Sequence, residues 1–145
     1  MGKLIALPYE IVVVDDHPQI RVELRKLIAE KAGLSVVGEL RNGKELLESL
    51  KTRIPQVVIL DISMPRLGGI EATRQLKSSH PEIKVLILTL HNRREYVQQA
   101  RQAGAEGYLL KDEVDQELLG AIETLRQGKT YLSPLLGLKP PARLY

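Results

Sequence analysis

The chain contains no cysteine, tryptophan or phenylalanine, and its five tyrosines supply the whole 3% aromatic content. Without cysteine, a disulfide framework, a thiolate zinc site and a cysteine nucleophile are all excluded. So few rings also leave no set of aromatic side chains on which nucleic-acid bases could stack. The missing disulfides are compatible with a reducing compartment.

Long hydrophobic runs are absent as well. No apolar stretch approaches the roughly 20 residues that a membrane-spanning helix needs, and residues 1–10 lack the long apolar core of a signal peptide. We therefore expect a soluble, cytoplasmic protein with no membrane partner.

Charge of one sign is not concentrated in any segment. The 145 residues include 21 Lys and Arg against 18 Asp and Glu, a net charge of +3, and the two signs are interleaved over the whole length. Pairs such as Arg93-Arg94 are typical of a solvated helix surface rather than of a stripe that follows phosphates. The basic balance alone does not predict a nucleic-acid binder. Length and a hydrophobic content of 43% predict one globular domain with its own core.

Short strand-like runs are the main pattern of the chain, and they occupy residues 11–14, 35–40, 57–60, 85–88 and 108–110. They alternate with segments of helical period, which is typical of βαβ units in a parallel sheet covered on both faces. We predict a doubly wound, flavodoxin-like α/β fold with five parallel strands in the order 2-1-3-4-5 and five helices.

Proline, glycine and asparagine mark the ends of the predicted helices. The first helix begins near Pro18 and the second near Asn42, and the other three span residues 70–78, 93–103 and 114–127. We expect the domain to cover residues 10–128. Residues 129–145 hold three of the eight prolines and no helical period, so they are predicted to be a linker or tail.

Chemically active side chains follow four of the predicted strands. Asp15 and Asp16 come after the first, Asp61 after the third, Thr89 after the fourth and Lys111 after the fifth. Taken singly, the acid pair is more simply a helix cap, and the threonine and lysine carry no signal. Because the carboxyl ends of parallel strands meet at one edge, where open α/β sheets build their sites, we expect the five to share a pocket.

Three carboxylates in one pocket repel one another unless their negative charge is offset. Two of them about 4 Å apart repel by about 4 kcal/mol at an effective dielectric constant near 20, so a cation or a raised pKa is required. Mg²⁺ is a hard ion that takes a few carboxylates and keeps several waters. With that charge offset, Asp61 can attack a phosphoryl group, while Lys111 neutralises its oxygens and Thr89 donates a hydrogen bond.

Four motifs, read together, resemble the receiver domain of two-component response regulators over about residues 10–128. They are VVVDDHPQIR, VVILDISMP with GG shortly after it, VLILTL and GYLLKD. The resemblance implies that Asp61 is the phosphoacceptor and that Asp16 and Asp61 ligate Mg²⁺ directly. Asp15 would act largely through water, and the backbone carbonyl of Ser63 would complete the protein ligands.

The resemblance also implies a switch. Thr89 and Lys111 would hold the phosphoryl group, Thr89 would move toward it, and Tyr108 would turn into the vacated space. The face built by the fourth helix, the last strand and the fifth helix would then change shape. Phosphorylation adds roughly two negative charges, which is enough to bias such a bistable element.

The segment GYLLKDE, followed by LLGAIETLRQGKTYLSP, resembles the NarL/LuxR type of regulator, in which a helix-turn-helix DNA-binding domain follows the receiver. The implied partners are a sensor histidine kinase, a second copy of the chain on phosphorylation, and DNA only through an output domain. Residues 129–145 are too few to form that domain. We therefore expect a truncated receiver of a transcription regulator, with a stand-alone receiver acting through protein binding as the alternative.

Some positions depart from the family pattern or modulate it. Leu90 is larger than the residue often found after the threonine, and we expect it to narrow the access of the phosphodonor. Ser63 and His91 resemble positions that tune the lifetime of the phosphate. His17, His80 and His91 are too widely spread in the sequence to suggest a zinc site, and we expect them to be surface residues.

Two other classes of protein are also built on a parallel sheet, and the second, a flavin carrier, has the same predicted strand order. A phosphohydrolase of the haloacid dehalogenase kind also uses an Asp nucleophile and Mg²⁺, but it places its two acids two residues apart after the first strand, whereas Asp15 and Asp16 are adjacent. A flavin carrier needs a hydroxyl- and glycine-rich phosphate loop there, and the acid pair would repel a phosphate. We therefore expect a phosphoacceptor signalling domain rather than a turnover enzyme.

Overall fold

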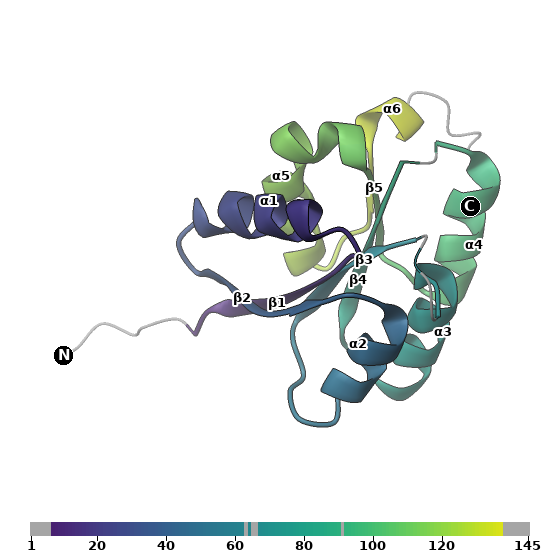
Figure 1. Cartoon of the computed structure of the whole chain (residues 1–145). Coiled ribbons are helices and arrows are strands. Elements are labelled where there is room, and N and C mark those ends of the chain that lie inside the picture. The colour runs from purple at the N-terminus through teal and green to yellow at the C-terminus, as the bar shows by residue number, and fades with distance from the viewer. Residues whose placement is uncertain (1–6, 63, 65–66, 91, 138–145) are drawn as a thin grey trace.

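A parallel sheet runs through the computed structural model, which describes residues 7–62, 64, 67–90 and 92–137 (Figure 1). In these ranges the strands are β1 (Tyr9–Val14), β2 (Leu34–Leu40), β3 (Val57–Asp61), β4 (Lys84–Thr89), β5 (Gly107–Leu110) and β6 (Tyr131–Leu132). Their order across the sheet is β2-β1-β3-β4-β5-β6, and every neighbouring pair is parallel. The predicted order of the first five strands is confirmed.

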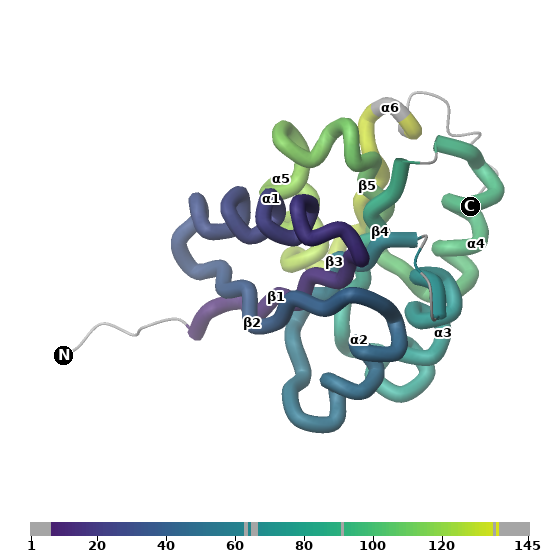
Figure 2. The backbone as a smooth tube through the Cα atoms, viewed as in Figure 1, coloured from purple at the N-terminus to yellow at the C-terminus, as the bar shows by residue number. Residues whose placement is uncertain are grey.

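Helices cover both faces of the sheet. They are α1 (Pro18–Ala29), α2 (Gly43–Ser49), α3 (Gly69–Ser79), α4 (Arg94–Ala103), α5 (Val114–Arg126) and the short α6 (Pro134–Gly137), with a 3₁₀ turn, η1 (Lys111–Glu113), before α5. Helices α1 and α5 lie on one face, and α2, α3 and α4 lie on the other (Figures 1 and 2). None of the helices in the described ranges is long and apolar enough to cross a membrane.

The apolar runs are explained by burial on both faces. In β1, Ile11 and Val13 pack with α1 and α5, whereas Val12 and Val14 pack with α2 and α3. Strands β3 and β4 divide their side chains in the same way. Because neither face is solvated, the strands show no alternation of polar and apolar residues.

The sheet has one short edge strand beyond the five that were predicted. Tyr131 and Leu132, placed in the predicted linker, pair with Gly107 and Tyr108 as β6. The next residue, Ser133, is fully buried: its backbone N–H donates to the carbonyl of Tyr108, and its Oγ accepts from the N–H of Leu110, both at 2.9 Å. A strand of two residues is too short to show a periodic pattern.

The predicted helix ends are correct to within one or two residues where capping groups mark them. The Oδ1 of Asn42 accepts from the backbone N–H of Glu45 at 2.9 Å, so it caps α2 as expected. Gly104 ends α4 in the left-handed conformation, with φ of 106°.

The sheet reverses its winding between β1 and β3. From β1 the chain passes first to β2 on one side, and it later returns to β3 on the other. The loops that follow β1 and β3 therefore diverge, and in open α/β sheets such a switch point forms a crevice at the carboxyl edge.

Candidate functional site

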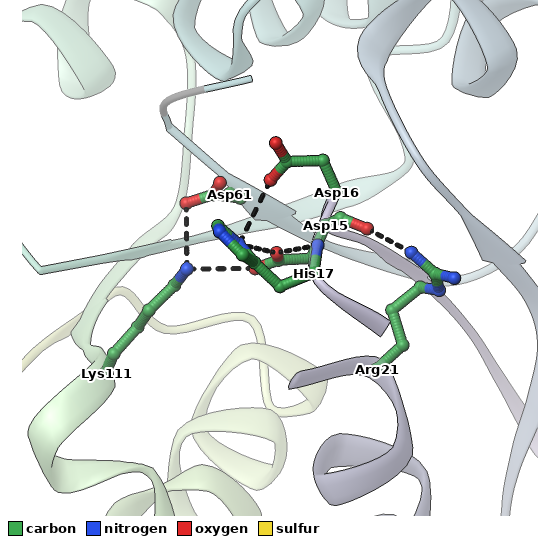
Figure 3. Close-up of polar contacts among 6 residues, drawn as sticks. All are labelled: Asp15, Asp16, His17, Arg21, Asp61 and Lys111. Carbon is green, nitrogen blue, oxygen red and sulfur yellow. Dashed lines mark hydrogen bonds and ion pairs between the residues drawn. The ribbon is translucent and has the colours of Figure 1, made fainter. Parts of the chain in front are cut away.

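The carboxyl edge of the sheet brings the predicted site residues together. Asp15 and Asp16 follow β1, Asp61 ends β3, Thr89 ends β4 and Lys111 follows β5. Figure 3 shows the three carboxylates and the ammonium of Lys111 facing a common space. One predicted ligand, the carbonyl of Ser63, lies outside the described residues.

Lys111 bridges two of the carboxylates. Its Nζ lies 3.0 Å from Asp15 Oδ2 and 3.3 Å from Asp61 Oδ1, and only 11% of its side chain is exposed. Burial by itself lowers the pKa of Lys111, but the hydrogen bonds and charges of Asp15 and Asp61 outweigh burial and raise the pKa above its ordinary value. The ammonium therefore stays charged at neutral pH between two carboxylates.

The carboxylates fit a divalent cation. Ligand atoms of Asp15, Asp16, His17 and Asp61 all lie within 4.8 Å of one another. Asp15 Oδ2 and Asp16 Oδ1 are buried and accept no well-aligned hydrogen bond, although Lys111 and His17 lie within ion-pair distance of them. One ammonium only partly offsets the repulsion among three carboxylates, and a hard cation with oxygen ligands would offset the rest.

Two residues hold Asp15 in place, and neither was assigned to the site from the sequence. Arg21 in α1 donates to the backbone carbonyl of Asp15 at 2.6 Å. The backbone N–H of His17 donates to Asp15 Oδ1 at 2.9 Å, and its Nδ1 lies 3.0 Å from the same oxygen. His17 is a surface residue as expected, with 61% of its side chain exposed, but its ring faces the carboxylates. Arg21 lies in the first turn of α1, five residues after Asp16, and its position in the sequence does not reveal this contact.

Gly69 explains the double glycine of the β3–α3 loop. A Cβ at this position would collide with the backbone carbonyl of Asp61 and lie 2.9 Å from the Cα of Ile62. The N–H of Gly69 donates to the Ile62 carbonyl at 3.1 Å. Only glycine allows α3 to begin this close to the strand that carries Asp61.

Thr89 and Tyr108 form a buried pair on neighbouring strands, and their side chains share a hydrogen bond. Burial raises the pKa of Tyr108 to about 12; the bond to Thr89 acts in the opposite direction, and nearby Tyr96 adds to the rise. Tyr108 is only 3% exposed, so its ring lies inside the protein. A hollow of about 340 Å³ beside it is lined by residues that include Val97 and Leu132.

Other features of the surface lie apart from this chemistry. A hollow of about 650 Å³ between α2 and α3 contains none of the residues of the carboxyl-edge site.

Leu90, directly after Thr89, is 69% exposed, and His91 lies outside the described residues.

Sequence comparison identifies relatives over most of the chain. Residues 11–123 match the family model of the response regulator receiver domain. Response regulator GacA of Pseudomonas protegens is 40% identical over 124 residues, which cover 86% of this chain and 58% of GacA. Response regulator UvrY of Escherichia coli K12 is 36% identical over 123 residues, which cover 85% of this chain and 56% of UvrY. The chain thus spans little more than half the length of these relatives.

Solved structures give the same result. A LuxR-family two-component response regulator from Aurantimonas sp. SI85-9A1 superposes with a TM-score of 0.87 at 34% identity, covering 90% of this chain and 94% of that one. The isolated receiver domain of RcsB from Salmonella enterica serovar Typhimurium, solved with the phosphomimetic BeF₃⁻, gives a TM-score of 0.84 at 26% identity and covers 90% and 96%. This chain belongs to the receiver domain family of two-component response regulators.

Proposed function

We propose that this receiver accepts a phosphoryl group from a sensor histidine kinase on Asp61. The observation that carries the proposal is the placement of the Asp61 carboxylate 3.3 Å from Lys111 Nζ, in a cluster with Asp15 and Asp16. A single carboxylate at a strand end is ordinary. A carboxylate held beside both a largely buried ammonium and an acid pair has the surroundings that phosphoryl transfer needs.

Asp16 and Asp61 are the proposed direct ligands of Mg²⁺, with Asp15 acting through water and the carbonyl of Ser63 completing the set. The buried oxygens of Asp15 and Asp16 that lack aligned hydrogen bonds support this assignment. When bound, the ion supplies positive charge that offsets the repulsion between Asp61 and the oxygens of an incoming phosphoryl group.

The chain's own residues perform the transfer. A carboxylate oxygen of Asp61 attacks the phosphorus, the phosphorus–nitrogen bond to the kinase histidine breaks, and the imidazole leaves with the electron pair and takes up a proton. Lys111 is charged and already beside Asp61, so it can pair with an oxygen of the new acyl phosphate. Thr89 donates a hydrogen bond to another of its oxygens.

Phosphorylation then changes the partner of Thr89. Its side chain shares a hydrogen bond with Tyr108, and a phosphoryl oxygen on Asp61 would compete for the Thr89 hydroxyl. Tyr108 loses this bond inside a buried site, and the hollow lined by Tyr108, Val97 and Leu132 gives its ring room to reposition. We propose that phosphorylation shifts an equilibrium between two arrangements of the α4–β5–α5 face.

The output is proposed to be control of transcription. Residues 10–128, together with β6, would be the receiver, and the residues after β6 would lead to a DNA-binding output domain. Structures of RcsB include a complex with DNA and dimers bound to DNA; for this chain, dimerisation on phosphorylation and DNA binding through an output domain are proposals. We place the receiver in the cytoplasm, where an ATP-dependent kinase can phosphorylate it. A receiver that acts alone by binding other proteins is the alternative.

Intact mass spectrometry tests the phosphoacceptor. After incubation with acetyl phosphate and Mg²⁺, we expect a single phosphoryl adduct that is acid-stable, base-labile and absent without Mg²⁺. The adduct should be lost in Asp61→Asn and kept in Asp112→Asn, which alters an exposed carboxylate near the same edge. Modification retained in Asp61→Asn would overturn the assignment, and steady release of phosphate from small esters would instead indicate a phosphohydrolase.

A further inference from the structure

The ring of His17 places its Nδ1 beside the acidic cluster of Asp15, Asp16 and Asp61. Its Nδ1 lies 3.0 Å from Asp15 Oδ1 and 3.1 Å from Asp16 Oδ1, and Figure 3 shows the ring beside both carboxylates. His17 occupies the position before α1, yet its side chain makes no capping hydrogen bond to the helix. The ring therefore faces the site rather than serving the local helix.

The spacing of these atoms suits one coordination shell. Around an octahedral ion with ligands at about 2.1 Å, neighbouring ligand atoms lie about 3.0 Å apart and opposite ones about 4.2 Å apart. The 3.1 Å between His17 Nδ1 and Asp16 Oδ1 corresponds to a neighbouring pair. A carboxylate oxygen of Asp61 lies no more than 4.8 Å from the ligand atoms of Asp15, Asp16 and His17.

We infer that His17 is a further side-chain ligand beside Asp16 and Asp61, which makes the site bind transition-metal ions such as Mn²⁺ more tightly than Mg²⁺. The inference rests on the proposed function, because it assigns a role in the same metal site. Imidazole favours first-row transition ions, whereas Mg²⁺ retains oxygen ligands and water. His17 thus adds affinity for the first kind of ion and little for the second.

The position of His17 makes this role feasible. Its backbone is fixed by the hydrogen bond from its N–H to Asp15 Oδ1 and by Pro18 at the start of α1. The ring is largely exposed, so it can adjust its torsion angles to an ion without disturbing the core. Substituting it should not unfold the chain.

The test compares the binding of Mn²⁺ and Mg²⁺ by titration calorimetry at fixed pH, in the absence of any phosphodonor. We expect His17→Ala to weaken Mn²⁺ binding by about tenfold and to leave Mg²⁺ binding nearly unchanged. His80→Ala is the matched control, because that ring contacts Ser79 at the end of α3, away from the cluster. Electron spin-echo spectroscopy of bound Mn²⁺ should show coupling to a ring nitrogen in the wild type and in His80→Ala, but not in His17→Ala.

The outcomes separate this inference from the proposed function. Absence of nitrogen coupling in the wild type, or an equal loss of Mn²⁺ and Mg²⁺ affinity in His17→Ala, would overturn the role of His17 alone. If Asp61→Asn bound both ions as tightly as the wild type, the proposed metal site itself would be wrong, whatever His17 does. A thermal melt of each variant establishes that the fold is kept.

Discussion

Gly69 is the residue whose side-chain size most directly limits the geometry of the phosphoacceptor. We expect Gly69→Ala to cost about 1–3 kcal/mol of stability, the usual range for overpacking, because the new Cβ collides with the carbonyl of Asp61. The strand end that carries the Asp61 carboxylate must shift, so phosphorylation by acetyl phosphate should also slow. Urea denaturation and the rate of adduct formation measure the two effects.

Gly120 provides the control for that substitution. It lies within α5, and a Cβ there would meet nothing within 4 Å. Gly120→Ala should therefore stabilise the chain by up to about 1 kcal/mol through helix propensity and leave the phosphorylation rate unchanged. If both alanine variants behaved alike, close packing against Asp61 would not be the reason for glycine at position 69.

The residues of the site differ in how far the sequence could place them. Asp15, Asp61 and Lys111 were assigned to one edge because each follows an apolar run, and the structure brings them together. His17 and Arg21 could not be assigned to the site from the sequence. The contacts of the His17 ring, and the hydrogen bond from Arg21 to the Asp15 carbonyl, depend on side-chain torsions and on the packing of α1 against β1. The chemical roles of all these residues remain predictions.

Strand β6 lies in the predicted linker and pairs with β5, the strand that carries Tyr108. Ser133 follows β6 and makes two hydrogen bonds to β5, next to both Tyr108 and Lys111. Ser133→Ala leaves the buried N–H of Leu110 without its acceptor, which should cost about 1–3 kcal/mol. Hydrogen exchange at Leu110 should accelerate correspondingly, and urea denaturation measures the loss.

An exposed serine gives the comparison for Ser133. Ser78 lies in α3 with an exposed side chain, so Ser78→Ala should change stability by no more than about 0.5 kcal/mol. Equal stabilities of the two variants would contradict the structural role of the Ser133 hydroxyl.

The longer elements were predictable and β6 was not, for a physical reason. Strands buried on both faces require uninterrupted apolar residues, so β1, β3 and β4 can be recognised from composition alone. β6 is held at the edge of the sheet by backbone pairing and by Ser133, and backbone hydrogen bonds leave no pattern in the sequence. The helix ends were only partly predictable. A capping side chain such as Asn42 marks the start of α2, whereas α1 and α4 begin without one.

For the molecule as a whole, alkaline pH is expected to reduce stability. Burial is the main cause that raises the pKa of Tyr108 to about 12 and the pKa values of Tyr9 and Tyr131 above their ordinary value. The pKa of Lys111 is raised as well, because its carboxylate partners outweigh its burial. All four groups hold their protons more tightly in the folded chain than in the unfolded chain.

The sign of the effect follows from proton linkage. A raised folded pKa contributes stability that is fully present below the unfolded pKa, about 10 for tyrosine, and is lost as pH rises through the folded pKa. The urea midpoint should therefore be steady up to about pH 9 and fall steeply between about pH 10 and 12. Tyr108→Phe removes one of these groups, so its midpoint should fall less steeply over that interval. Parallel curves for the wild type and Tyr108→Phe would show that burial of the Tyr108 hydroxyl does not contribute to the alkaline transition.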